Sequence, residues 1–320
     1  RQLGRDRGAR PALPRRGAGH GLRTFRDAIR TRPFTVTADL ALDRTTDAAA
    51  VRRQARLLAP LVDAIQVPDA HDGRLQMSGL AAAAILLGEA IDPLVHLTGR
   101  DRNRIALEND LLGLGALGVT SLLLTRGEEL PAGYKPPTRQ VLELSGEDLV
   151  TTAVQLGEDE SIRAVPGFCV GTAATVFAPK AGWTPKSLLA RVDAGVAFVQ
   201  TQVCFNMKAM RRYMEHLVSA RLTWRCAVVV SLAVLPDAAS ARLLRQHLPG
   251  TVIPENLVQR IAQAADPELE GIRVCAEKIQ RLREIPGVSG VNLMTPGPTE
   301  LLVEAISAAG LADPAAKITH

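Results

Sequence analysis

PLVHLTGRDRNRIALENDLLGLGALGVTSLLLT (Pro93–Thr125) is the stretch that best indicates how this chain folds. It starts with a short apolar run, continues through a segment with leucines at helical spacing (Asn103–Leu117), and ends in a second apolar run (Val119–Thr125). Short apolar runs next to helical segments are typical of strands in a parallel sheet, because helices cover both faces of such a sheet. The stretch therefore predicts a strand–helix–strand unit.

The same alternation continues through the rest of the chain. Strand candidates lie at Phe34–Asp39, Val62–Asp69, Pro93–Thr98, Val119–Thr125, Arg163–Gly171, Val196–Gln202, Cys226–Leu232 and Gly290–Met294. Helical patterns lie at Asp47–Ala59, Ser78–Ala90, Asn103–Leu117, Lys186–Asp193, Met207–Ser219, Ala239–His247, Pro254–Ala264, Glu268–Glu284 and Thr299–Ala309. Eight strand–helix units in alternation predict an α/β fold, a single (β/α)8 TIM barrel.

An open, doubly wound α/β sheet is the main alternative architecture. That fold normally has a glycine-rich phosphate-binding turn after its first strand. Here the first strand runs into TADLALDRTTD (Thr37–Asp47), which contains no glycine. The sequence therefore favours the barrel.

The composition agrees with one large globular domain. The chain has 320 residues, of which 47% are hydrophobic, enough for a sizeable core and too many for a disordered chain. Aromatic residues make up only 3%, so Ala, Leu, Val and Ile must fill the core. The scarcity of aromatic rings also argues against a nucleic-acid surface built on base stacking.

Positive charge is concentrated at the N-terminus. Residues 1–32 contain ten arginines against Asp6 and Asp27, a balance of +8, whereas the whole chain carries +5, so the remaining 288 residues carry −3. We expect residues 1–23 to form a flexible, solvated basic extension and residues 24–320 to form the barrel. A polyanion could bind such an extension, but we expect no nucleic-acid partner.

Cysteine usage and hydropathy bear on the compartment. Cys169, Cys204, Cys226 and Cys275 show no metal-ligand or CxxC spacing, so we expect free thiols in a reducing compartment and no metal site. The chain contains no uninterrupted apolar run of about 18 residues, so we expect no membrane-spanning segment. We therefore expect a cytoplasmic protein with no membrane partner, and whether it forms a homo-oligomer stays open.

Polar residues lie at the predicted C-terminal ends of the strands, where the active sites of such barrels are built. In chain order these are Asp39, Asp69, His96, Arg126-Gly127-Glu128, Gly171-Thr172, Gln202, Ser231 and Met294-Thr295. The set contains no Ser–His–Asp arrangement typical of a catalytic triad and no two-histidine metal motif. It suits binding of a polar heteroaromatic ligand better than formation of a covalent intermediate.

Each of these groups also has a purely structural interpretation. Asp39 could cap the next helix, and His96 could be a hydrogen-bonded core histidine. The segment RDRN (Arg100–Asn103) could simply start a helix, and Gln202 alone carries little information. Only the ordered set favours a binding site.

Longer segments resemble the methylenetetrahydrofolate reductase family. HLTGRDRNRIALENDLLGLGALGVTSLLLTRGEEL (His96–Leu130) is similar to the region of that family's third and fourth strands. RVDAGVAFVQTQVCF (Arg191–Phe205) is similar to its Lys-Val-Asp-Ala-Gly segment, and GTVIPENLVQRI (Gly250–Ile261) and GVSGVNLM (Gly287–Met294) fit its last third. The resemblance spans Phe34 to Leu311.

The resemblance implies a FAD-containing barrel that uses NADH or NADPH to reduce methylenetetrahydrofolate to methyltetrahydrofolate. Residue by residue, it implies FAD contacts for His96, Arg126, Gly127, Glu128 and Gly171. Arg191 takes the place of the family's lysine near the FAD phosphates, and Gln202 matches the glutamine that hydrogen-bonds the folate. Asp69 and Glu128 are further candidates for binding the tetrahydrofolate derivative.

Three departures from the family pattern bear on the chemistry. Asp39 stands where the family has a catalytic glutamate followed by a Pro-Pro pair, and that glutamate is the acid that opens the methylene bridge. Glu128 stands where the family has an aspartate, so we expect Asp39 and Glu128 as the catalytic carboxyl groups of a reshaped folate pocket. GTAATVFAPKAGWTP (Gly171–Pro185) replaces the family's usual loop after the fifth strand, so adenine and ribose contacts do not transfer.

The expected function is a FAD-dependent oxidoreductase that interconverts 5,10-methylenetetrahydrofolate and 5-methyltetrahydrofolate. The direction in the cell is open, and an oxidative role in demethylation is one alternative. The second alternative is a folate- or flavin-binding paralogue with little reductase activity that serves a methyl-transfer system. The exchanged carboxylates are its only support.

Overall fold

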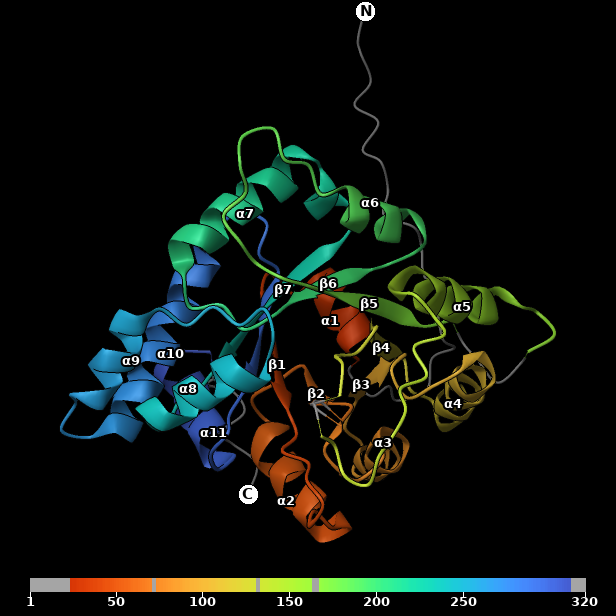
Figure 1. The fold of residues 1–320 in the computed structure, drawn as a ribbon, viewed down its shortest axis with the longest axis horizontal. Helices are drawn as coiled ribbons and strands as arrows, with labels where there is room; N and C mark the ends of the chain where they lie inside the picture. The colour runs from red at the N-terminus through yellow and green to blue at the C-terminus, as the bar shows by residue number, and fades with distance from the viewer. Residues whose placement is uncertain (1–23, 71–72, 131–132, 163–166, 312–320) are drawn as a thin grey trace, which may run out of the picture.

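The computed structural model describes residues 24–70, 73–130, 133–162 and 167–311. Within them, eight parallel strands close into a barrel in chain order, with β1 paired to both β2 and β8 (Figure 1). The strands are β1 (Thr35–Asp39), β2 (Ala64–Val67), β3 (Pro93–Thr98), β4 (Ser121–Thr125), β5 (Cys169–Ala174), β6 (Phe198–Thr201), β7 (Ala227–Ala233) and β8 (Gly290–Met294). The predicted (β/α)8 barrel is thus confirmed, and the expected flexible extension, residues 1–23, lies outside the described residues.

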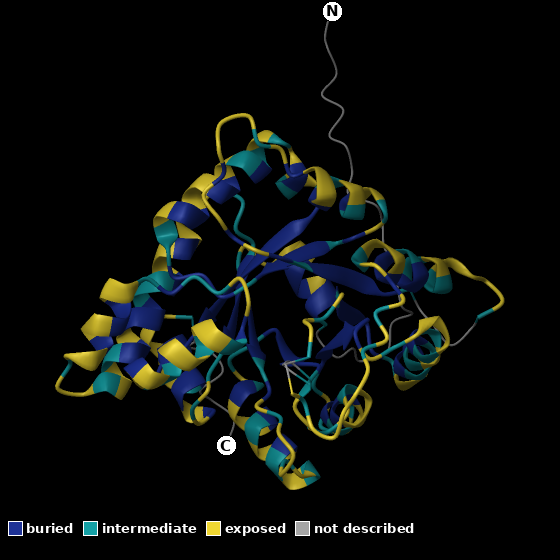
Figure 2. Ribbon diagram, in the orientation of Figure 1, coloured by how far each residue is buried: buried dark blue, intermediate teal, exposed yellow. Residues whose placement is uncertain are grey.

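Helices surround the barrel and cover its outer face. They are α2 (Ala48–Leu58), α3 (Gly79–Gly88), α4 (Arg104–Leu117), α5 (Gly146–Glu158), α6 (Lys186–Asp193), α7 (Met207–Ser219), α8 (Ala238–His247), α9 (Glu255–Ala262), α10 (Pro267–Arg283) and α11 (Glu300–Ala308). Their inner faces are buried and their outer faces exposed (Figure 2). Within the described residues, no helix is long and apolar enough to cross a membrane.

Local sequence signals fix the ends of α4, the helix of the opening stretch. Asn103 caps its start by accepting a hydrogen bond from the Ala106 amide at 2.9 Å. Gly118, at φ +94°, ends it in the left-handed conformation that glycine adopts without a steric penalty. The RDRN segment is therefore a helix start, with Asn103 as the capping residue.

Most bounds differ from the predicted ones by one or two residues, and three elements differ more. β5 continues three residues beyond the predicted end at Gly171, because its small residues (Gly171–Ala174) carry little strand signal. Helix α5, which begins with a capping box formed by Ser145 and Asp148, was not among the predicted helices. Helix α1 (Phe25–Thr31) was not predicted either.

Helix α1 closes the N-terminal end of the barrel. The Phe25 ring packs edge-to-face on Phe198 inside the barrel, with ring centroids 5.0 Å apart. The carboxylate of Asp92, just before β3, accepts a hydrogen bond from the Phe25 amide at 2.8 Å. Arg26 donates to the carbonyl of Thr120 at 3.0 Å and to that of Gly167. With this end blocked, the C-terminal ends of the strands are the open face of the barrel.

Candidate functional site

Two cavities open at the C-terminal ends of the strands. The first, of about 460 Å³, lies over the ends of β3 to β6. The second, of about 370 Å³, lies over the ends of β1, β2 and β8. Leu248, which directly follows α8, lines both cavities, so the two hollows are neighbours on one rim.

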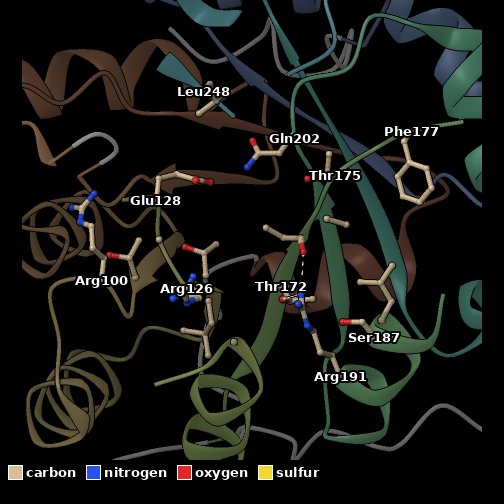
Figure 3. A pocket seen from close by; sticks show the side chains of 18 of the residues that line it. Arg100, Arg126, Glu128, Thr172, Thr175, Phe177, Ser187, Arg191, Gln202 and Leu248 are labelled. Atoms are coloured by element: carbon tan, nitrogen blue, oxygen red, sulfur yellow. Dashed lines mark hydrogen bonds between the residues drawn. The ribbon is translucent and has the colours of Figure 1, made fainter. Parts of the chain in front are cut away.

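The first cavity brings together five residues that the sequence singled out. They are Arg126, Gly127, Glu128, Arg191 and Gln202. In Figure 3, Arg126 and Glu128 lie on one side of the cavity, across from Gln202, which follows β6, and Arg191 of α6. Asp39 lines the second cavity.

Gly127 allows the chain after β4 to turn close to the end of β3. Its φ is +83°, and a Cβ there would lie 2.8 Å from the Cβ of Arg100 and 3.1 Å from that of Thr98. A side chain would therefore collide as well as strain the backbone. The turn places the exposed side chains of Arg126 and Glu128 at the cavity.

Arg191 and Gln202 contribute a cation and an amide. Arg191 is half-buried, and its Nη1 donates to the hydroxyl of Thr172 at 3.0 Å and to the carbonyl of Ala173 at 3.2 Å, which fixes the guanidinium against β5. The backbone amide of Gln202 donates to Ala174 at 2.8 Å. Its side-chain amide makes no hydrogen bond to any described residue, so it is available to a ligand.

Asp39 at the end of β1 is held by Asn292 of the neighbouring strand β8. Asn292 Nδ2 donates to Asp39 Oδ1 at 3.0 Å. Burial raises the pKa of Asp39 to about 7, although the hydrogen bond from Asn292 lowers it. Asp43, in the same cavity, differs because hydrogen bonds from Thr45 and Thr46 lower its pKa. Asp39 therefore can carry a proton near neutral pH.

A buried polar network fills the barrel below the rim and reaches Asp39. Its members are Thr37, Gln66, His96, Gln200 and Asn292. The side-chain oxygen of Gln66 lies 2.6 Å from His96 Nε2. The side-chain nitrogen of Gln66 donates to Thr37 and to Gln200, both at 2.8 Å. Thr37 in turn donates to Asn292 Oδ1 at 2.9 Å. These bonds satisfy the buried amides and fix the orientation of Asn292 beneath the acid.

Three predicted site residues line neither cavity. His96 lies in the buried network, one layer below the rim. Gly171 packs inside the barrel, where a Cβ would lie 2.1 Å from Cζ of Phe198. Asp69 is buried and pairs with Arg102 at 2.6 Å. For Asp69, the charge of Arg102 and hydrogen bonds from Thr98 and Ala70 outweigh burial and lower its pKa.

Sequence reasoning did not identify four residues that the structure places at or under the site. Phe177 and Tyr213 line the first cavity, and Gln66 and Asn292 form the network under Asp39. The sequence could have indicated Gln66 and Asn292, because each is a polar residue in an otherwise apolar strand. Phe177 and Tyr213 give no comparable local signal.

The arrangement suits a planar, polar and partly anionic ligand. Two arginines offer positive charge, Gln202 and Glu128 offer hydrogen bonds, and Asp39 offers a proton from the neighbouring cavity. Within the described residues, no group of three or more His, Cys, Asp or Glu side chains is placed to hold a metal ion.

Comparison with known proteins places this geometry in context. The family model for methylenetetrahydrofolate reductase matches residues 25–310, which include every strand of the barrel and both cavities. No match was found among curated proteins.

Proposed function

Because this chain belongs to the methylenetetrahydrofolate reductase family, we propose that it is a FAD-dependent oxidoreductase of the methylene/methyl-tetrahydrofolate couple. NADH or NADPH is the proposed co-substrate. The observation that carries the proposal is the placement of Asp39, held by Asn292, on the same rim as a cavity lined by Arg126, Arg191 and Gln202. Burial of Asp39, which raises its pKa to about 7, supports it. A general acid works best when its pKa lies near the working pH.

The residues of the first cavity fit a flavin dinucleotide. Arg126 and Arg191 supply charge for its phosphates, and Gly127 lets the backbone approach a ligand closely. Arg191, in place of the family's lysine, adds a planar guanidinium that can hold a phosphate with two hydrogen bonds. Bound there, FAD would supply the hydride carrier between the nicotinamide and the folate.

Gln202 and Glu128 are the proposed folate ligands on this side of the rim. The free amide of Gln202 can both donate to and accept from the pterin ring. Glu128 stands where the family has a shorter aspartate, so its carboxylate reaches further into the cavity. One lengthened acid, Glu128, and one shortened acid, Asp39, are consistent with a folate pocket shifted toward β1.

Asp39 is the proposed proton donor in the folate half-reaction. Its protonated carboxyl group gives a proton to one bridging nitrogen of methylenetetrahydrofolate as that C–N bond breaks, and the bonding electron pair goes to this nitrogen. The other nitrogen keeps the methylene group as an iminium, which can accept hydride. In the opposite direction the Asp39 carboxylate takes the proton back, so the same residue serves either physiological direction.

Comparing two aspartates of one cavity tests the role of Asp39. Asp39→Asn should slow reoxidation of the reduced flavin by methylenetetrahydrofolate about a hundredfold or more, the order expected for loss of a positioned acid, and leave reduction by NAD(P)H unchanged. Asp43→Asn is the matched control, because Asp43 lines the same cavity but has a lowered pKa. Equal rates of flavin reoxidation by methylenetetrahydrofolate in Asp39→Asn and Asp43→Asn would refute the assignment of Asp39 as the acid. Flavin binding with no folate turnover in the unaltered protein would favour the binding paralogue.

A further inference from the structure

Gln54 of α2 bonds two loops that lie far apart in the sequence. Its side-chain oxygen accepts hydrogen bonds from the amide of Ala41 at 2.8 Å and from the hydroxyl of Thr299 at 3.3 Å. Its side-chain nitrogen donates to the carbonyl of Ala41 at 3.0 Å. Ala41 follows β1, and Thr299 immediately precedes α11, which packs against α2 (Figure 1). One side chain thus joins the loop after β1 to the loop after β8.

The two joined loops form part of the wall of the second cavity. Ala41 and Thr299 line that cavity together with Asp39. Gln54 does not line it, but with the same two residues it lines a separate hollow beside the exposed Arg53 of α2. The Gln54 amide therefore lies behind the wall, so its effect on a ligand in the cavity is indirect.

The loop after β1 depends on Gln54 for its attachment to the barrel. Within residues 41–46, the other hydrogen bonds are internal and join Asp43 to Thr45 and Thr46. Among the described residues, only the bonds with Gln54 connect this stretch to another segment by hydrogen bonding. The amide of Leu40, next to Asp39, is held separately by the carbonyl of Gln66 at 2.9 Å. Loss of the Gln54 amide would therefore leave Asp39 at the end of β1 and loosen the wall that follows it.

We propose that Gln54 is a positioning residue that holds the wall of the second cavity closed around the folate. The inference rests on the proposed function for the identity of the ligand. Binding is weaker when a loop must be ordered as the ligand enters, because the loop then loses conformational freedom. Gln54 fixes both loops beforehand, so a folate that binds beside Asp39 finds the wall already in place.

The same wall shields Asp39 from water. Burial is the largest influence on this carboxyl group and raises its pKa to about 7. When the wall loosens and water reaches the group, its pKa should fall toward the ordinary value of 3.8. Loss of Gln54 and loss of Asn292, whose hydrogen bond lowers this pKa, should therefore act in opposite directions. The other titratable or charged groups around Asp39 are Asp43, Arg74 and His247 in the cavity and His96 in the network below.

The test compares Gln54→Leu and Gln54→Glu with a matched control, Gln259→Leu. Gln259 is an exposed residue of α9 that lines neither cavity. Single-turnover reoxidation of the reduced flavin gives the half-saturating concentration of methylenetetrahydrofolate. The same measurement from pH 6 to 9 gives the pH at which the rate declines on the alkaline side.

Gln54→Leu should raise the half-saturating concentration about tenfold, the order expected when two net hydrogen bonds of a loop are lost. Its alkaline decline should move to lower pH, and reduction of the flavin by NAD(P)H should be unchanged. Gln54→Glu keeps the acceptors for Ala41 and Thr299 but cannot donate to the Ala41 carbonyl, so it should recover part of the affinity. Gln259→Leu should match the unaltered protein in every measurement.

A half-saturating concentration and a pH profile in Gln54→Leu equal to those of Gln259→Leu would overturn the proposal. Equal slowing of flavin reduction and reoxidation, with a lower melting temperature, would also overturn it, because a merely structural residue acts in that way. Amide hydrogen exchange of residues 40–46 separates these failures from failure of the proposed function. If methylenetetrahydrofolate does not reoxidise the flavin of the unaltered protein, but these amides exchange faster in Gln54→Leu, the wall contact stands and the folate chemistry falls. If reoxidation occurs and neither exchange nor half-saturation changes, the folate chemistry stands and the role of Gln54 falls.

Discussion

Asn292 holds Asp39 from the neighbouring strand, with Nδ2 of Asn292 3.0 Å from Oδ1 of Asp39. This hydrogen bond lowers the pKa of Asp39 and so opposes the increase that burial causes. Asn292 is itself fixed by Thr37 and, through it, by Gln66. The protonation of the proposed acid therefore depends on residues that line neither cavity.

Replacing Asn292 should shift the pH dependence of the folate half-reaction. The hydrogen bond from Asn292 lowers the pKa of Asp39, so Asn292→Leu should raise it above about 7. The rate requires the protonated acid, so its decline on the alkaline side should move to higher pH. Single-turnover reoxidation of the flavin from pH 6 to 9 measures this, with Gln200→Leu as the control because Gln200 bonds Gln66 and not Asp39. Identical pH profiles in Asn292→Leu and Gln200→Leu would show that Asn292 does not control the pKa of Asp39.

Asp69 should behave as a structural residue. Asp69→Asn removes the charge partner of Arg102 and weakens the link between the ends of β2 and β3. We expect a loss of about 2 kcal/mol in the free energy of unfolding, since the pair is largely buried but Arg102 keeps Asp110 as a second partner. Urea unfolding measures it. A raised KM for folate with undiminished stability would instead support the predicted substrate contact.

Gly171 offers a similar choice between packing and cofactor contact. Gly171→Ala would place a Cβ 2.1 Å from Phe198 Cζ inside the barrel, so we expect a loss of about 1–3 kcal/mol. Gly88→Ala is the matched control, because Gly88 lies in α3 with nothing within 4 Å of an added Cβ. That substitution should be neutral or stabilise by about 0.5–1 kcal/mol. Weaker FAD binding in Gly171→Ala at unchanged stability would point to a cofactor contact.

Asp92 under helix α1 should make stability depend on pH. Burial raises its pKa to about 7 from an ordinary 3.8, against opposing hydrogen bonds from Phe25 and Thr120. Between these values the folded chain binds more protons than the unfolded chain, so stability falls as pH rises from about 4 to 7. The full difference is at most about 4 kcal/mol. Asp39 acts in the same direction.

Denaturant unfolding at pH 5 and pH 8 measures this dependence in the unaltered protein and in Asp92→Asn. The variant should lose less stability than the unaltered protein between the two pH values. A steeper loss in the variant, or a rise in stability from pH 5 to pH 8 in the unaltered protein, would contradict the assignment to Asp92.

The barrel was predictable because its signals are local. Apolar runs and helical spacing identified all eight strands, and two of them, Pro93–Thr98 and Gly290–Met294, have the predicted bounds. β5 was misplaced toward the N-terminus because glycine and alanine carry weak strand preference. Helix α5 was missed although its Ser145–Asp148 capping box is a local signal.

The site was predictable in part, because sequence shows which face a residue is on but not its depth. Asp39 ends β1 and Gln202 follows β6, and both lie at the rim. His96 and Gly171 also point into the barrel, but their strands continue two and three residues further, which leaves them below the rim. Depth depends on the stagger between strands, and stagger is a property of the closed barrel.

We propose that this chain passes hydride from a reduced nicotinamide through FAD to a folate. The direct measurement is the flavin absorbance of the FAD-loaded protein, followed anaerobically in two steps. We predict that NADH or NADPH bleaches the flavin band and that methylenetetrahydrofolate then restores it with formation of methyltetrahydrofolate. A protein that takes up no FAD, or whose bleached flavin does not recover its colour with methylenetetrahydrofolate, would contradict the claim.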